Sequence, residues 1–258
     1  MDDVNLSYDE LVADALAAAD AMRRWDFDYL EGRTSTDPLP WSYPNLARDA
    51  ISRSRRLLDM DTGGGEVLAS LAPLPPHTVA TEGWEPNIRV ARERLEPLGV
   101  EVRRAHGETL PVEDGEFDLV LNRHAAFDVA EVWRALAPGG HFLMQQVGSR
   151  NDLELNAALG APPALEPDSD TCAGAVAGLE RQGFQVLEAV EAFPAVRFHN
   201  IAEVVYQLTI VSWQAPGFDV TRYDAKLREL DRRIRAEGPL VVHNHRYIIR
   251  AVKPDDAP

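Results

Sequence analysis

Hydrophobic and polar positions alternate along the central part of the chain in a pattern typical of an α/β protein. Short apolar runs take turns with segments in which apolar residues recur every three or four positions. The runs that we predict as strands are residues 56–60, 78–81, 101–105, 117–121 and 141–147. The segments that we predict as helices are 46–55, 66–71, 86–98 and one that runs from 129 to the turn at 138–140. Strands separated by helices of this length need crossover connections, so we expect a doubly wound, mainly parallel sheet.

The N-terminal part of the chain begins with a helix signal. Ser7 and Glu10 have the spacing of a capping box, in which each side chain bonds the backbone amide of the other residue. The apolar stripe that follows at helical spacing is made of Leu11, Ala15, Leu16, Ala19 and Met22. We therefore predict a first helix that buries this stripe.

An aromatic, proline-rich segment without clear periodicity comes next. Its aromatic residues are Trp25, Phe27, Tyr29, Trp41 and Tyr43. A disordered linker would not carry so many large rings, so we interpret residues 25–44 as an ordered loop or lid. The expected organisation is an N-terminal helix and aromatic lid at residues 1–45, followed by one domain at 46–258.

The C-terminal third is less regular. Helices are expected at 172–182 and 223–236, a sixth strand at 184–190 and a last strand at 246–252, which makes seven strands in all. Residues 201–213 are apolar and fit either a helix or an extended segment. We interpret 151–172 and 199–222 as insertions on the substrate side of the domain.

Composition restricts the partners. The chain has 26 Lys and Arg against 42 Asp and Glu, a formal net charge of −16, which repels nucleic acid and anionic lipid over most of the surface. The single cysteine, Cys172, excludes an intrachain disulfide framework, and no metal-ligand spacing is seen. The acidic N-terminus lacks an apolar leader segment, and no apolar run of 18 residues occurs. We expect a cytoplasmic, soluble protein, with a homodimer as a further expectation.

The turn after the first strand of the sheet carries the strongest chemical signal. Gly63, Gly64 and Gly65 allow a tight turn and a close approach of backbone to a ligand. The third glycine of a dinucleotide-binding pattern would fall at Leu68, and no Gly-Lys-Ser/Thr follows, so neither that pattern nor a P-loop is present. Acidic residues around the turn, such as Asp61, would repel a diphosphate and favour a ligand with ammonium and sulfonium charges.

This turn resembles motif I of the class I S-adenosylmethionine-dependent methyltransferases, which implies a Rossmann-like fold and S-adenosyl-L-methionine as the cofactor. Asp59 takes the family's acidic position, and Gly63 and Gly65 match its second and third glycines. The first glycine is replaced by Asp61, beside Thr62. Asp61 could distort the turn or hold the amino group of the cofactor, and we favour the second.

Further matches follow in the order of the family, and together they cover about residues 57–148. Glu82, followed by Gly83, stands where an acidic residue binds both ribose hydroxyls. Trp84 is expected to pack on the adenine, or else in the core. His106, with Gly107 and Glu108, stands where an Asp commonly binds the adenine amino group. Asn122, at the end of the fourth strand of the sheet, completes the expected cofactor site.

Candidate acceptor residues follow the fourth and fifth strands of the sheet, where α/β proteins place their ligands. His124 is our candidate base, with Asp128 to orient it, although a surface or helix-capping histidine is the alternative. Arg123 could hold an anionic acceptor. The other residues that we expect to bind the substrate are Trp25, Tyr29, Gln145, Arg150 and Tyr206.

The resemblance implies methyl transfer, and we expect a small-molecule acceptor, with a role in specialised metabolism. One alternative is a tRNA or rRNA methyltransferase, but the arginines at 53–56, 89–104 and 222–235 are interleaved with acidic residues and indicate solvated helix faces. Another is a non-catalytic protein that binds S-adenosylmethionine, because a fold does not determine a function.

Overall fold

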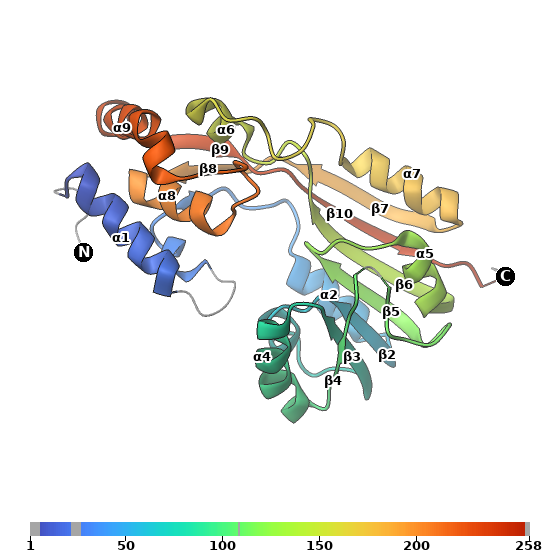
Figure 1. The fold of residues 1–258 in the computed structure, drawn as a ribbon. Helices are drawn as coiled ribbons and strands as arrows, with labels where there is room; N and C mark the ends of the chain where they lie inside the picture. Colours follow the sequence, from blue (N-terminus) through green and yellow to red (C-terminus); the bar gives the residue numbers. More distant parts are fainter. Residues whose placement is uncertain (1–5, 22–26, 108, 256–258) are drawn as a thin grey trace. The chain divides into compact units, whose positions relative to one another are not determined.

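The computed structural model describes residues 6–21, 27–107 and 109–255 (Figure 1). Its helices, with η marking 3₁₀ turns, are α1 (Tyr8–Ala21), η2 (Asp28–Leu30), α2 (Tyr43–Ile51), α3 (Glu66–Ser70), α4 (Glu85–Leu95), η3 (Glu96–Leu98), α5 (Val129–Ala135), α6 (Leu153–Leu159), α7 (Cys172–Gln182), α8 (Ile201–Ile210) and α9 (Val220–Glu237). Its strands are β1 (Ser35–Thr36), β2 (Arg56–Met60), β3 (His77–Glu82), β4 (Glu101–Arg104), β5 (Phe117–Arg123), β6 (Leu136–Val147), β7 (Gln185–Ala192), β8 (Ala195–Phe198), β9 (Leu240–His243) and β10 (Arg246–Val252). In the described part of the chain, no helix combines the length and apolar character needed to cross a membrane.

The chain forms two compact units. The helical unit consists of the described residues of 1–39 together with Ser149–Ser169 and Ala192–His245. The sheet unit consists of Pro40–Gly148, Asp170–Glu191 and the described residues of 246–258. This division differs from the expected boundary after residue 45, because two later segments join the first helix. It also separates Trp41 and Tyr43 from the rest of the aromatic segment, so that the lid remains a prediction.

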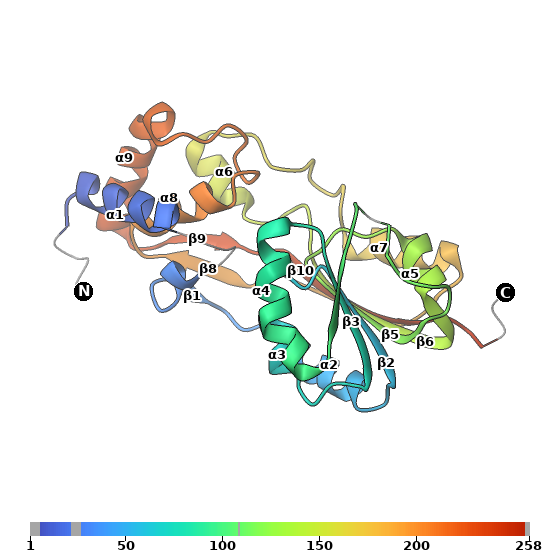
Figure 2. The ribbon, with the colours of Figure 1, turned by 60° about the horizontal axis from the view of Figure 1, so that its bottom comes forward.

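The sheet unit is built on a seven-stranded sheet in the order β4-β3-β2-β5-β6-β10-β7 (Figure 2). Strands β2 to β6 pair in parallel, and β10 pairs antiparallel with β6 from Arg246 opposite Val147 to Val252 opposite His141. The prediction of a doubly wound, mainly parallel sheet of seven strands is confirmed. The carboxyl ends of the five parallel strands consequently lie at one edge of the sheet.

Both faces of this sheet are covered by helices, since its strands are apolar at consecutive positions. On one face, Leu57, Leu119 and Leu143 share a buried cluster with residues of α2, α3 and α4. On the other face, Leu58 and Val120 share a cluster with residues of α5 and α7 (Figure 1). Successive residues of each strand point to opposite faces of the sheet, so each strand contributes to the hydrophobic clusters on both faces.

The helical unit surrounds α8, seven of whose ten residues are buried in one hydrophobic cluster with residues of α1, α9 and α6. The capping box at the start of α1 is confirmed, because the Ser7 amide donates to the Glu10 carboxylate at 2.8 Å and the Glu10 amide donates to Ser7 Oγ at 3.3 Å. A three-stranded sheet in the order β1-β8-β9 completes the unit and was not predicted. Residues 201–213, for which two structures were expected, begin with the helix α8.

Three sequence expectations need correction. Leu16 is not part of the buried stripe of α1, because 38% of it is exposed; Met22 lies outside the described residues. The helix expected to reach the turn at 138–140 ends at Ala135, and β6 begins at the next residue. Residues 138–140 are instead part of this long strand, and the Gly139 amide donates to the Lys253 carbonyl at 2.8 Å.

Candidate active site

The glycine turn joins β2 to α3 at the carboxyl edge of the sheet. Asp61 adopts a left-handed backbone conformation with φ of 46°, and its amide donates to Thr81 Oγ1 at 3.1 Å. Gly63 and Gly65 have φ of 64° and 80°. A methyl group on Gly65 would lie 2.8 Å from Leu95 of α4, so this glycine permits close helix packing. A methyl group on Gly63 would have no atom within 4 Å, so the outer side of the turn is open.

Acidic side chains gather around this turn. Burial raises the pKa of Asp59 to about 6, although the Thr62 side chain and the nearby positive charge of Arg123 oppose the shift. Burial and the negative charge of Glu82 raise the pKa of Asp61 to about 6. Carboxylates with raised pKa values at one edge provide a site in which a cationic ligand would stabilise the ionised forms.

The Glu82 carboxylate, at the end of β3, is held in one orientation. The residue is only 5% exposed, and its side chain accepts hydrogen bonds from the Trp84 amide at 2.7 Å and from Asn87 Nδ2 at 3.4 Å. Each oxygen keeps a further lone pair for a ligand hydroxyl. Trp84 is 50% exposed, so the core-packing alternative for its indole ring is excluded.

The residues that follow β4 lie at the surface. His106 and Gly107 are exposed, and His106 forms an isolated antiparallel bridge with Thr109. Gly107 has φ of 64°, which a glycine adopts without strain. Glu108 lies outside the described residues, so its expected contact with the cofactor stays a prediction.

Asn122, at the end of β5, is fully buried. Its side-chain oxygen accepts a hydrogen bond from Gln146 Nε2 at 2.7 Å, and the same nitrogen donates to the Ala125 carbonyl at 2.8 Å. Asn122 therefore fixes the backbone that leads from β5 to the predicted acceptor residues. Tyr43, at the start of α2, is also buried nearby, and its pKa is raised by burial and by the negative charge of Asp59.

His124 directly follows β5 and has φ of 62°. Its amide donates to the Gln145 carbonyl at 2.8 Å, and its Nε2 lies 3.0 Å from Gln145 Nε2. Trp41 Nε1 in turn donates to Gln145 Oε1 at 2.7 Å. Although the residue is solvent-exposed overall, protein atoms crowd the ring, and this desolvation together with the charges of Arg123 and Arg246 lowers the pKa of His124 to about 3.

Asp128 does not orient His124 in the structure. Its carboxylate accepts a hydrogen bond from the Ala130 amide at 2.7 Å and so caps the N-terminus of α5. The side chain that contacts the His124 ring is Gln145, which we had expected to bind substrate. Gln146, which we expected beside Gln145 in the acceptor pocket, instead donates to Asn122 and to the Ala125 carbonyl. Trp41, which donates to Gln145, and Thr81, which accepts from the Asp61 amide, were not among the predicted site residues. The sequence gives no direct signal for either residue, because the pairing of the strands brings Thr81 to the site and the position of α2 brings Trp41 there.

The other predicted substrate residues lie in the helical unit, except that Trp25 is outside the described residues. Tyr206 is 2% exposed and stacks on Tyr29 with ring centroids 4.5 Å apart. Tyr29 also donates a hydrogen bond to Asp14 at 2.6 Å. Arg150 pairs with Asp168 at 2.6 Å. Packing and ion pairing within this unit account for the described contacts of all three residues, so substrate binding by them stays a prediction.

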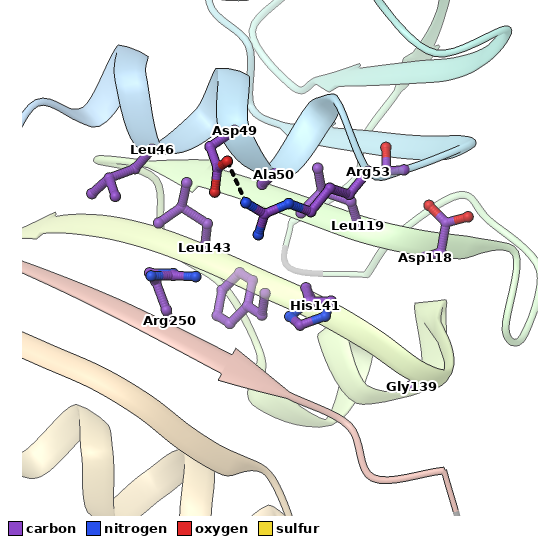
Figure 3. Close-up of a pocket in the computed structure, with 12 residues that line it drawn as sticks. Leu46, Asp49, Ala50, Arg53, Asp118, Leu119, Gly139, His141, Leu143 and Arg250 are labelled. Carbon is purple, nitrogen blue, oxygen red and sulfur yellow. Dashed lines mark hydrogen bonds and ion pairs between the residues drawn. The ribbon is translucent and has the colours of Figure 1, made fainter.

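A cavity of about 250 Å³ lies elsewhere in the sheet unit, beneath α2 (Figure 3). It is lined by residues of α2 and of the turn that follows it, by residues of β5 and β6, and by Arg250 of β10. Asp49 of α2 and Arg53, which follows the end of α2, form an ion pair there. None of its lining residues is among the predicted site residues, and the cavity lies away from the carboxyl ends of the strands.

Part of the sheet unit is similar to known methyltransferases. Residues 58–144 match the family described as methyltransferase domain. The chain is 31% identical over 140 residues to protein-L-isoaspartate O-methyltransferase from Bradyrhizobium, covering 53% of this chain and 64% of that protein. It is 34% identical over 88 residues to ubiquinone biosynthesis O-methyltransferase from Roseobacter denitrificans, covering 33% of this chain and 36% of that protein. The chain thus spans less than two thirds of the length of these relatives.

Solved structures agree on the fold. The BH2331 protein from Bacillus halodurans superposes with a TM-score of 0.59 at 19% identity, over 83% of this chain and all of that chain. The region matched by the family model contains the glycine turn, Glu82 and Asn122 on strands ordered as described above. Residues 58–144 thus match a methyltransferase domain, and the solved structure shows that the chain shares its fold.

Proposed function

We propose that this protein transfers a methyl group from S-adenosylmethionine to a small molecule. The observation that carries the proposal is the gathering of Asp59, Asp61 and Glu82 beside an open glycine turn, within a domain of the methyltransferase family. Bound S-adenosylmethionine would supply an electrophilic methyl group on a sulfonium centre. Its positive charges match the three carboxylates.

The residues of the turn fit this cofactor. Thr62 Oγ1 is buried beside the Asp59 carboxylate, the pKa of which it lowers, and makes no short hydrogen bond among the described residues, so it keeps capacity for a polar ligand atom. The Glu82 carboxylate has lone pairs left for the two ribose hydroxyls, and the exposed Trp84 ring offers an apolar plane to the adenine. The Asp61 carboxylate would hold the ammonium group, and the raised pKa values of Asp59 and Asp61 would fall on binding.

Charge distribution favours a small molecule over tRNA or rRNA. Arginines within the three basic stretches already pair with carboxylates, as in Arg103 with Glu116 at 3.0 Å and Arg235 with Asp231 at 2.9 Å. Because the whole chain has a net charge of −16, such paired arginines leave little positive field for a phosphate backbone. Methyl transfer itself needs mainly alignment and exclusion of water, which a small-molecule site provides.

A turnover assay separates the candidate functions. The protein would be incubated with S-adenosylmethionine and either a panel of small molecules, with planar and oxygen-bearing members, or total tRNA and rRNA. We expect formation of S-adenosylhomocysteine with small molecules, at a rate that is insensitive to salt between 50 and 200 mM. Methylated RNA, with a rate that falls steeply over the same salt range, would overturn the small-molecule proposal. Cofactor binding without turnover on either panel would support a non-catalytic protein.

A further inference from the structure

Three side chains of the sheet unit form a continuous hydrogen-bond chain beside the predicted acceptor site. Trp41 precedes α2, Gln145 lies on β6 and His124 follows β5. Trp41 Nε1 and Gln145 Oε1 are 2.7 Å apart, and Gln145 Nε2 and His124 Nε2 are 3.0 Å apart. Gln145 is only 4% exposed, so its amide group depends on these partners for its hydrogen bonds.

The direction of each bond in this chain follows from elementary chemistry. The indole N–H of Trp41 can only donate, so the group of Gln145 that faces it must be the carbonyl oxygen. The amide nitrogen of Gln145 then faces His124 and can only donate. His124 Nε2 must therefore accept, which requires a lone pair on that nitrogen. An imidazole ring with a free lone pair on Nε2 is neutral and carries its proton on Nδ1.

Two further features hold the ring in this state. The His124 amide donates to the Gln145 carbonyl, so Gln145 fixes both the backbone and the ring of His124. The charged groups that act on the ring are both positive: Arg123, the last residue of β5, and Arg246 of β10. Together with the desolvation of the ring by surrounding protein atoms, they disfavour an imidazolium ion. Within the described part of the chain, no residue accepts a hydrogen bond from His124 Nδ1, so this N–H is free for a ligand.

We propose that Trp41 and Gln145 are positioning residues that hold His124 neutral with its proton on Nδ1, so that His124 meets the methyl acceptor as a hydrogen-bond donor and not as a base. The only basic lone pair of the ring is used by Gln145, which replaces our first hypothesis for His124. The implied acceptor carries a carbonyl, carboxylate or phenolate oxygen that His124 binds, with the guanidinium of Arg123 nearby. The part of the proposal that concerns the acceptor rests on the proposed function; the proton position does not.

Nitrogen NMR tests the proton position without any substrate. Protein labelled with ¹⁵N-histidine would be recorded between pH 5 and 8, and the His124 ring would be identified by its loss in His124→Asn. We expect a protonated Nδ1, a non-protonated and hydrogen-bonded Nε2, and no titration in this range. A proton on Nε2, or an imidazolium ion at pH 7, would overturn the proposal. The ring of His77, which faces Glu116 at 3.1 Å on the same unit, is the internal control.

Two variants test whether the hydrogen-bond chain causes this state. In Gln145→Glu the carboxylate can only accept, so we expect the proton to move to Nε2 and the pKa of His124 to rise. In Trp41→Phe the amide of Gln145 loses its fixed orientation, so we expect a mixture of proton positions. An unchanged proton on Nδ1 in a folded Gln145→Glu protein would contradict the positioning role. The wild-type spectrum remains decisive if a variant does not fold.

A pair of substitutions at His124 tests the donor role in turnover, with an acceptor found by the panel above. Asn and Asp have the same shape and both tolerate a left-handed backbone, but only Asn donates a hydrogen bond. We expect His124→Asn to keep turnover within about tenfold of wild type and His124→Asp to lose about a hundredfold. The reverse order would show that a base is needed. A failed methyltransferase function would instead appear as missing turnover in wild type while the NMR result stands.

Discussion

Asp61 combines an unfavourable backbone conformation with a proposed role in cofactor binding. Its φ of 46° lies in the left-handed region, which costs an L-residue about 1–2 kcal/mol relative to glycine, although Asp is among the residues that visit it most readily. Motif I, which this turn resembles, has glycine at this position, so the carboxylate of Asp61 is explained if it contributes to ligand binding.

Substitution of Asp61 separates its charge from its backbone. Asp61→Asn keeps the shape and the tolerance of left-handed φ but removes a charge that the folded state disfavours at pH 7, so we expect a higher free energy of unfolding and about tenfold weaker binding of S-adenosylmethionine. Asp61→Gly should weaken binding equally and keep or increase the free energy of unfolding. Calorimetry and chemical denaturation measure the two effects. Wild-type affinity in both variants would remove Asp61 from the cofactor site.

Asp59 predicts a pH dependence of stability. Its folded pKa of about 6 lies above the ordinary value of 3.8, so the folded protein holds this proton at pH values where the unfolded chain has lost it. The resulting stabilisation is present below pH 4 and is lost as the pH rises through 6. Relative to Asp59→Asn, wild type should therefore lose about 1–3 kcal/mol in its free energy of unfolding between pH 4 and 7. A difference that does not change with pH would contradict the raised pKa.

At the scale of elements, the glycine turn sets the distance between α3 and α4. Gly65→Ala would place a methyl group 2.8 Å from Leu95 at φ of 80°, so we expect a loss of about 2–4 kcal/mol in the free energy of unfolding. Gly63→Ala is the matched control, because it has a similar φ but open space, and should cost about 1–2 kcal/mol. Urea denaturation of both variants provides the comparison. Equal losses would show that the contact with Leu95 relaxes without cost.

The same variants distinguish packing from ligand contact. The open side of Gly63 faces the space that we assign to the cofactor, so Gly63→Ala should weaken binding of S-adenosylmethionine more than Gly65→Ala does, after correction for the folded fraction. Calorimetry at a temperature where both variants are folded makes this measurement. The opposite ranking would place the cofactor away from the turn.

The elements that the sequence predicted well are those whose signals are local. Strand β2 and helix α7 have the predicted bounds, since an apolar run in one case and a Thr171 cap with a final Gly183 in the other mark both ends. Strands β1 and β8 were missed, because they are only two and four residues long and pair across more than 150 positions of the chain. Helix α5 was extended too far because Pro138 and Gly139 imitate a helix stop although they lie within a strand.

In the candidate site, too, the sequence predicted the residues with local signals and not those that depend on contacts between distant segments. Glu82 and the glycine turn follow strands directly, so their position at the carboxyl edge could be inferred from the sequence. The contact between Trp41, Gln145 and His124 could not, because it depends on the register of β5 with β6 and on the position of α2. Asp128 was assigned to His124 by proximity in sequence, whereas the backbone after it uses the carboxylate as a helix cap.

At the scale of the whole molecule, the cofactor site and the proposed donor lie in one unit, and three of the predicted substrate residues lie in the described part of the other. The contacts within the sheet unit define the proposed cofactor site, whereas the turnover panel is needed to identify the acceptor. The proposed methyl transfer therefore requires that the carboxylates of the sheet unit bind S-adenosylmethionine.

The most direct test is isothermal titration calorimetry of the wild-type protein and of Glu82→Ala with S-adenosylmethionine, S-adenosylhomocysteine and NAD. We expect micromolar binding of the first two ligands, none of NAD, and a loss of about 1–3 kcal/mol in Glu82→Ala, because the bonds of two ribose hydroxyls to a charged acceptor are removed. Unchanged affinity in Glu82→Ala would contradict the ribose assignment. Absence of binding to either S-adenosyl compound by the folded wild-type protein would contradict the proposed function itself.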